Sequence, residues 1–343
     1  MSAPYIPSPF ASPVIAPQVG STGAPPLAYV SNSQFAFAPT AIDTAHLVPG
    51  GQPFQQSQAL ADTLARASAW VNNYCFGADP ASKGASLAAS LSVEAAYVSI
   101  KAAELRLICD YKPVLEVVGV DIGISPGSVS SIGPQLAAMT RVGRRTIYVP
   151  MSPGMVLARV GDVGGSIPSS WMPGGHVYAV WSYVNGYPHT KLAANVAAGA
   201  TTCTVMSTDG AGGLWGVYPA SGSFPGTLMT VPDGANTESV YVQAITPGTT
   251  TTTLTTSTFA NDHTLPVAPD FLPFTAVPAD VQQAAIFMAM MLIKTRGSRA
   301  LVMPQTPGAS PSRQAFAQAG ALEDWDAATG ILARYAVRLK AKN

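Results

Sequence analysis

The chain has 343 residues, a formal net charge of zero and only 10% charged residues, where soluble domains carry about 25%. Hydrophobic residues make up 48%, and the chain holds 31 glycines and 30 prolines. This composition excludes a disulfide-stapled miniprotein, a simple coiled coil and a protein drawn to nucleic acid or acidic membranes by net charge. The length predicts about two or three packing units.

Residues 1–40 contain no charged side chain and hold eight prolines. Proline lacks a backbone N–H and has a fixed φ, so we predict an extended arm without a helix or a central strand. Its larger apolar side chains are candidates for contact with a neighbouring protein surface. The candidate arm contacts are Tyr5, Phe10, Ile15, Phe35 and Phe37.

The first helix is predicted to begin near Pro53, because proline suits the first helical position. Apolar residues such as Leu64 and Val71 recur at helical spacing until Gly77 ends the pattern. Residues 92–110 fit two interpretations, a helix or a β-hairpin, and the sequence leaves both open.

Strands are expected next, from runs of β-branched and aromatic residues with alternating polarity. The expected strands are 114–120, 145–149 and 176–184. The Pro126-Gly127 and Asn185-Gly186 pairs predict turns.

Residues 191–270 change in character, because Thr, Gly and Ala dominate and one basic residue faces five acidic ones. Asp233-Gly234 predicts a hairpin turn between two of the strands expected here. The expected strands are 201–205, 227–231, 237–245 and 251–256. We interpret this segment as a small β module inserted in the main domain.

The most apolar helix is expected from Pro278 to about Arg296. Its apolar residues lie nearly all round, which predicts burial on several sides, including against other subunits. Its longest uncharged run, residues 281–293, is shorter than the roughly 20 residues that cross a bilayer, so no membrane role is expected. The candidate intersubunit core is Ile286, Met290, Leu292 and Ile293.

A proline- and serine-rich linker leads to a last helix over about 322–340. Acidic residues at its start and basic residues at its end complement the helix dipole.

Together these elements predict an α+β fold with a helical core and β-hairpins. The expected parts are an extended arm (1–40), a core (41–190 and 271–303), an inserted β module (191–270), and a linker with the C-terminal helix (304–343).

No motif for catalysis, cofactor or metal binding emerges, so we expect a protein that is not an enzyme. The three cysteines lie far apart and form no CxxC pair, which predicts small buried thiols. The four histidines lack a metal-ligand spacing, and His189 is expected to be structural. Asp233 and Glu238 flank a hairpin, which disfavours paired-carboxylate catalysis. Arg141, Arg144 and Arg145 form too short a basic cluster for a nucleic-acid surface and are expected in solvent or in an intersubunit ion pair.

Several segments, in order over about residues 42–303, resemble the head-to-tail connector (adaptor) proteins of long-tailed bacteriophages, especially those infecting actinobacteria. The chain departs from that family in its longer arm and its enlarged region 125–175. The segments that carry the resemblance are 64–75 (LARASAWVNNYC), 111–117 (YKPVLEV), 183–193 (YVNGYPHTKLA), 197–202 (AAGATT), 225–228 (PGTL), 233–238 (DGANTE), 283–285 (QAA), 292–297 (LIKTRG) and 300–303 (ALVM).

The resemblance implies a structural virion protein in the neck, between capsid and tail, assembled in the host cytoplasm. It implies a ring, commonly of twelve copies, beneath the portal protein, with a stopper or tail-terminator protein on the other side. Genomic DNA would pass through the lumen without sequence-specific binding, and no cofactor is implied. The candidate portal-facing residues are Leu322, Trp325, Leu332, Arg334, Tyr335, Arg338 and Lys340. The alternative is another neck, tail or baseplate protein, similar to a stopper or tail terminator.

Overall fold

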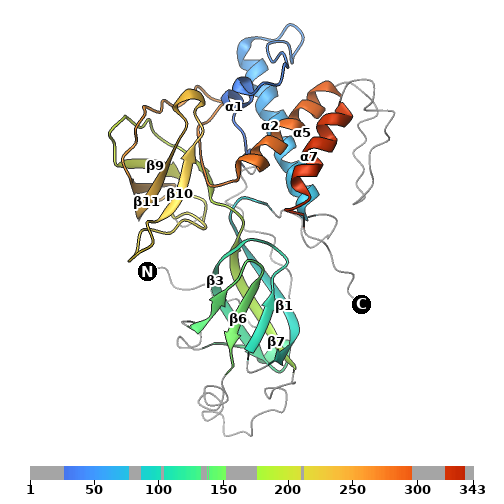
Figure 1. Cartoon of the computed structure of the whole chain (residues 1–343), viewed down its shortest axis with the longest axis vertical. Helices are drawn as coiled ribbons and strands as arrows, with labels where there is room; N and C mark the ends of the chain where they lie inside the picture. Colours follow the sequence, from blue (N-terminus) through green and yellow to red (C-terminus); the bar gives the residue numbers. More distant parts are fainter. Residues whose placement is uncertain are drawn as a thin grey trace. The chain divides into compact units, whose positions relative to one another are not determined.

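The computed structural model describes residues 27–76, 86–101, 104–132, 137, 139–151, 176–209, 212–295 and 321–336. They form two compact units (Figure 1). We call Ala89–Gly186 the strand unit, and the described residues before and after it the helix–sheet unit. Helices and antiparallel sheets are both present, so the predicted α+β class is confirmed.

The two units divide the chain differently from the predicted core and insertion. Residues 41–190 were expected in one core, whereas the structure separates Ala89–Gly186 from the chain on either side of it. The reason is long-range strand pairing, because β1 (Ser90–Lys101) and β7 (His176–Asn185) pair from Ser90–Asn185 to Ser99–His176.

The strand unit is one antiparallel sheet of seven strands in the order β4-β3-β7-β1-β2-β6-β5. A 3-10 turn, η3 (Pro126–Ser128), precedes β4 at the predicted Pro-Gly turn. The remaining strands are β2 (Glu104–Ile108), β3 (Val114–Gly123), β4 (Ser130–Ser131), β5 (Arg141–Val142) and β6 (Thr146–Pro150). Of the two interpretations for residues 92–110, the hairpin formed by β1 and β2 is the one observed.

This sheet curls until its far strands approach each other. The Val114 N–H at the start of β3 donates to the Arg144 carbonyl, which lies between β5 and β6, at 3.1 Å. Side chains on the concave face therefore pack into one apolar interior. Its fully buried members include Leu105, Leu107, Ile147, Val149, Val177 and Ala179.

The helix–sheet unit contains α2 (Pro53–Phe76), α5 (Ala279–Lys294) and α7 (Ala321–Leu332), which pack side by side (Figure 1). The predicted helix starting at Pro53 is confirmed, and its stripe of Leu60, Leu64, Ala67 and Val71 is buried. Pro278 occupies the N-cap of α5, as its place before an apolar helical pattern predicted.

A short helix, α1 (Asn32–Phe37), lies inside the segment predicted to be free of helix, so that prediction is wrong for these residues. Residues 27–38 contain no proline, and Ser31 with Gln34 forms a capping box. The Gln34 N–H donates to Ser31 Oγ at 3.2 Å, and the Ser31 N–H donates to Gln34 Oε1 at 2.9 Å. These bonds pair N–H groups that would otherwise lack partners.

The same unit holds a six-stranded antiparallel sheet in the order β8-β13-β10-β11-β12-β9. Its strands are β8 (His189–Lys191), β9 (Thr202–Met206), β10 (Thr227–Val231), β11 (Glu238–Pro247), β12 (Thr251–Thr256) and β13 (Pro273–Thr275). A 3-10 turn, η6 (Gly234–Asn236), links β10 to β11 where the sequence predicted a hairpin turn. The four strands predicted between residues 201 and 256 are thus confirmed.

This second sheet also closes on itself. Leu192, just after β8, forms a bridge with Val205 of β9, and the Thr190 hydroxyl donates to the Met206 carbonyl at 2.6 Å. The closed sheet surrounds a core of aliphatic and aromatic side chains, including Met229, Val231, Val240, Val242, Leu254 and Phe274.

Candidate functional site

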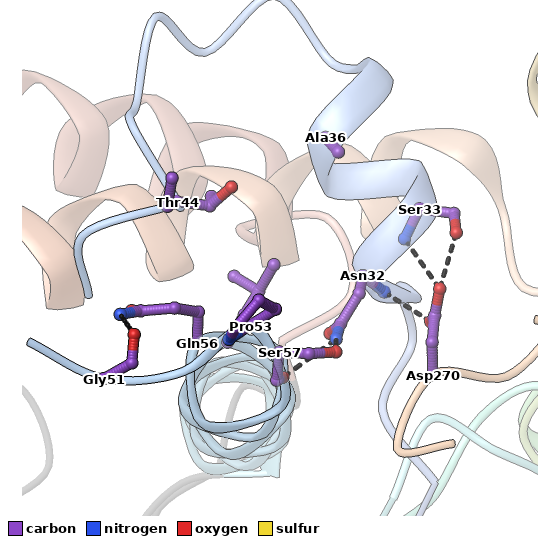
Figure 2. A pocket seen from close by; sticks show the side chains of 11 residues that line it. Asn32, Ser33, Ala36, Thr44, Gly51, Pro53, Gln56, Ser57 and Asp270 are labelled. Carbon is purple, nitrogen blue, oxygen red and sulfur yellow. Dashed lines mark hydrogen bonds between the residues drawn. The ribbon is translucent and has the colours of Figure 1, made fainter. Parts of the chain in front are cut away.

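A hollow of about 440 Å³ opens between α1, the chain that follows it and the first turns of α2 (Figure 2). Ala36, Ala45, Pro53 and Leu60 supply carbon to its walls, and Thr44 supplies a hydroxyl. The hollow lies wholly within the helix–sheet unit.

Asp270 fixes the start of α1 at the edge of this hollow. Its Oδ1 accepts from the Asn32 N–H at 2.8 Å, and its Oδ2 accepts from the Ser33 N–H at 3.2 Å and the Ser33 hydroxyl at 2.5 Å. The Phe271 N–H also donates to Oδ1, at 2.8 Å. A carboxylate is stabilised at a helix N-terminus, and these bonds occupy both oxygens of the only charged lining residue.

Gln56 of α2 holds the opposite wall. Its Oε1 accepts from the Val48 N–H at 2.6 Å, and its Nε2 donates to the Val48 carbonyl at 2.7 Å and the Gly51 carbonyl at 3.2 Å. Across the hollow, Asn32 Nδ2 donates to the Ser57 carbonyl and to Ser57 Oγ, both at 2.9 Å. The walls are therefore held in place by internal bonds.

The hollow is suited to binding an uncharged group. Its lining includes no His, Cys, Lys or Arg, and the Ser33 hydroxyl donates to a carboxylate rather than to a histidine. Nucleophilic catalysis uses a hydroxyl activated by an adjacent base, which this lining does not supply.

Sequence reasoning missed this site, although the Ser31–Gln34 capping box was a local signal for the helix that forms its wall.

A second polar cluster surrounds His263, whose side chain is fully buried. Nδ1 lies 3.0 Å from Asp233 Oδ2, and Nε2 lies 2.9 Å from Glu238 Oε1. The ring therefore bridges the two carboxylates, with one of them at each of its nitrogens.

Glu238 also accepts from the Ala260 N–H at 2.7 Å and the Asn261 N–H at 2.9 Å. Burial pushes the pKa of Glu238 upward, but these amide donors and His263 outweigh burial and hold the pKa below its usual value. The cluster ties the β10–β11 connection to the chain after β12, which is a structural role. The sequence placed both carboxylates beside a hairpin and gave no local signal for His263.

Glu94 is a buried carboxyl group in the strand unit, 8% exposed. The Tyr183 hydroxyl donates to it, and the Asp110 N–H donates to Oε1 at 2.9 Å. Burial is the main cause that raises the pKa of Glu94 to about 7; the Asp110 carboxylate adds to it, while the Tyr183 and Asp110 hydrogen bonds and Arg145 oppose it.

The cysteines are free and buried, as predicted. Burial raises the pKa of the Cys203 thiol to about 12, so this thiol is unreactive.

His189 has the structural surroundings expected of it. Burial lowers its pKa to about 4, and the neutral ring donates from Nε2 to the Ala28 carbonyl at 2.9 Å and accepts at Nδ1 from the Thr275 hydroxyl at 2.9 Å.

Among the residues that the structure describes, no group of three or more His, Cys, Asp and Glu side chains is arranged to hold a metal ion. In the same part of the chain, every helix falls short of the length and apolar character needed to cross a membrane.

The four residues of the candidate intersubunit core on α5 differ in how far they are buried. Met290, Leu292 and Ile293 are half-buried. Ile286 is 8% exposed and packs inside its own unit, so the expectation that it meets another subunit is corrected. The side of α5 that carries Val281, Ala285 and Ile286 fills the core of the chain itself.

The candidate portal-facing residues lie on α7 and just after it. Leu322, Trp325 and Tyr335 are half-buried, and Arg334 is exposed. Leu332 is fully buried against its own chain, which corrects its place in this group. Arg338 and Lys340 lie outside the described residues.

The last helix was predicted over 322–340 but ends at Leu332. The chain then turns so that the Tyr335 hydroxyl donates to Asp280, at 2.8 Å from Oδ1 and 3.0 Å from Oδ2. Arg334 pairs with the same carboxylate at the start of α5. Lys294 at the end of α5 lies 2.7 Å from Asp324, so ion pairs link both ends of the α5–α7 pair.

The candidate arm contacts also differ in burial. Phe35 is fully buried in its own unit, which corrects its assignment as a contact with a neighbour, whereas Phe37 is 74% exposed. Tyr5, Phe10 and Ile15 lie outside the described residues.

The basic cluster of the strand unit makes contacts within the chain. Arg141 pairs with Glu104 at 2.6 Å, and Arg145 Nε donates to the Cys109 carbonyl at 3.0 Å. Arg141 and Arg145 therefore have partners within the chain and do not need an ion pair with another subunit.

Comparison of the chain with protein-family models, with curated proteins and with solved structures gave no match. The resemblance to phage connectors therefore stays a prediction that depends on the sequence segments alone.

Proposed function

We propose that this chain is a structural protein of a phage virion. Copies of it form a ring beneath the portal, join the capsid to the tail and leave a lumen for DNA. The proposal combines the resemblance to connector proteins with the character of the surface that the fold leaves exposed.

The observation that carries the proposal is the number of large apolar side chains exposed on a chain with few charges. Contiguous exposed apolar surface marks contact sites for other proteins. Two of these side chains are direct neighbours, because Leu228 lies opposite Tyr241 on paired strands. The exposed set comprises Phe37, Phe54, Tyr97, Ile108, Ile124, Met139, Val142, Phe224, Leu228, Tyr241 and Val267.

The polar interior supports the same function. His263, His189 and Glu94 each make internal hydrogen bonds that hold strands or loops together. A structural subunit needs such bonds, because buried polar groups without partners destabilise a fold.

The helical layer offers the surface for neighbouring subunits. Met290, Leu292 and Ile293 of α5 and Trp325 of α7 keep part of their surface exposed. Obligate interfaces are apolar and often bury more than about 2,000 Å². A ring uses contacts of the head-to-tail type, in which two different surfaces of each copy meet.

The balanced charge suits DNA passage. The chain has 18 basic and 18 acidic residues. Tight binding to DNA depends on many basic contacts to phosphates, and such contacts would slow a moving duplex. A neutral chain supports a lumen that confines DNA without holding it.

Electron microscopy of the full chain mixed with portal protein tests this function. We expect closed twelve-fold rings seated on the portal. Rings with six-fold or three-fold symmetry that leave the portal free would favour the alternative neck or tail role. A monomer that binds no portal would contradict both.

Portal binding itself is tested by charge reversal at the basic C-terminal end. Arg338→Glu together with Lys340→Glu is expected to weaken portal binding at least ten-fold while the ring persists. Arg66→Glu, on the exposed side of α2, is the matched control and is expected to leave binding unchanged.

A further inference from the structure

We propose that the hollow between α1 and α2 receives the proline-rich arm, residues 1–26, of a second copy of this chain. This inference rests on the proposed assembly of several copies. It assigns a ligand class to the hollow: an uncharged, extended, proline-containing segment.

The walls fit such a segment. Ala36, Ala45, Pro53 and Leu60 give carbon surface for proline rings and aliphatic side chains. Extended proline-rich segments bind in grooves lined by apolar and aromatic side chains, because their conformation is already formed before binding. Phe37 and Phe54 directly follow two of the lining residues and are 74% and 62% exposed.

The polar groups fit as well. Each of the seven prolines in residues 1–26 lacks an N–H donor but keeps its carbonyl acceptor. The Thr44 hydroxyl at the wall is a donor for such a carbonyl (Figure 2).

Charge selects the occupant. The one lining carboxylate, Asp270, already accepts from Asn32, Ser33 and Phe271, so it offers little to a cationic ligand. Moving a charged peptide into such a site would be unfavourable, because its charge would lose water without gaining a partner. Residues 1–26 carry no charged side chain and hold seven of the prolines.

Length makes a second copy accessible. An extended segment of 26 residues spans about 80 Å at about 3.1 Å per residue. A compact unit of about 220 residues has a radius of gyration of only about 17 Å. A segment of this length is long enough to reach the next copy, and an arm seated there forms the head-to-tail contact that a ring repeats.

Disulfide trapping between two variants tests the proposal. One variant of the full chain carries Ser8→Cys or Ser12→Cys in the arm, and the other carries Ala45→Cys at the exposed edge of the hollow. The native cysteines are buried and do not compete. Because each variant has one new thiol, a covalent heterodimer forms only between copies.

We expect oxidation to give at least ten-fold more heterodimer with Ala45→Cys than with Thr253→Cys, an exposed control position on the closed sheet. Ala36→Trp, which fills the hollow from an exposed position, should reduce the yield at least five-fold. Equal yields at positions 45 and 253, or trapping only within one chain when both thiols are on the same copy, would overturn the proposal.

The particle mass of the unmodified chain separates this inference from the proposed function. Rings without arm trapping at the hollow would refute the inference and leave the ring intact as a proposal. Arm trapping in particles that are not rings would support the inference and refute the ring. Monomers alone would refute both.

Discussion

Replacing Glu94 with glutamine tests the physical account of the strand unit. The folded protein holds the pKa of Glu94 at about 7, against an ordinary value of 4.5, chiefly because the group is buried. At a pH between these two pKa values, Glu94 keeps its proton in the folded state and has lost it in the unfolded state. Stability therefore falls as pH rises from about 4.5 to 7, and the stabilising effect of the protonated carboxyl is lost above 7.

The size of the effect follows from the gap between the two pKa values. At about 1.36 kcal/mol per pH unit, it corresponds to about 3 kcal/mol of unfolding free energy. Glu94→Gln resembles the protonated group, since its carbonyl can still accept from the Tyr183 hydroxyl and the Asp110 N–H. The variant should match the natural protein at pH 4.5 and exceed its stability by up to about 3 kcal/mol at pH 8.

Hydrogen–deuterium exchange, corrected for the intrinsic effect of pH, measures this locally. Peptides from β1 and β7 should lose protection between pH 5 and pH 8 in the natural protein and keep it in Glu94→Gln. Peptides from the closed sheet of the helix–sheet unit serve as the internal control. Equal pH dependence of β1 and β7 in the two proteins would refute the reasoning.

Three further predictions test the helix–sheet unit. His263→Gln removes the ring that bridges two carboxylates and should lower the unfolding free energy by about 3 kcal/mol in urea denaturation; an unchanged midpoint would show that the cluster is not stabilising. Gly226→Ala should cost more than about 2 kcal/mol, because φ is +100° and a Cβ would overlap the Val242 carbonyl, whereas Gly222→Ala, in open space at φ +56°, should cost only about 1 kcal/mol; equal thermal shifts would contradict this. Trp325→Ala removes an edge-to-face contact between indole rings and should speed exchange of α7 amides at a cost of about 2 kcal/mol; unaltered exchange would mean that this contact does not hold α7.

Local patterns were enough to predict many elements of the fold. Proline before an apolar helical repeat predicted the starts of α2 and α5, because it fits a helix start and no interior position. Threonine and valine runs predicted β10 and β12 with their observed bounds, since branched side chains suit a strand.

Other features depend on contacts between distant residues and left no local signal. The hairpin at 92–110 forms where β1 pairs with β7, whose residues follow their partners by 77 (Ser99–His176) to 95 (Ser90–Asn185) positions, so periodicity could not decide it. α1 was missed because the high proline content of residues 1–40 outweighed the Ser31–Gln34 capping box. The His263 cluster and the hollow at Asp270 likewise bring together residues from separate parts of the chain. Burial of Ile286 and Leu332 inside their own unit has the same origin, because an apolar helix side does not reveal which surface will cover it.

The mass of the full chain in solution, measured by native mass spectrometry at micromolar concentration, tests the central proposal most directly. A closed ring of twelve copies of the 35.3 kDa chain predicts a single species of about 420 kDa. A single species at 35.3 kDa over the whole concentration range would contradict the account.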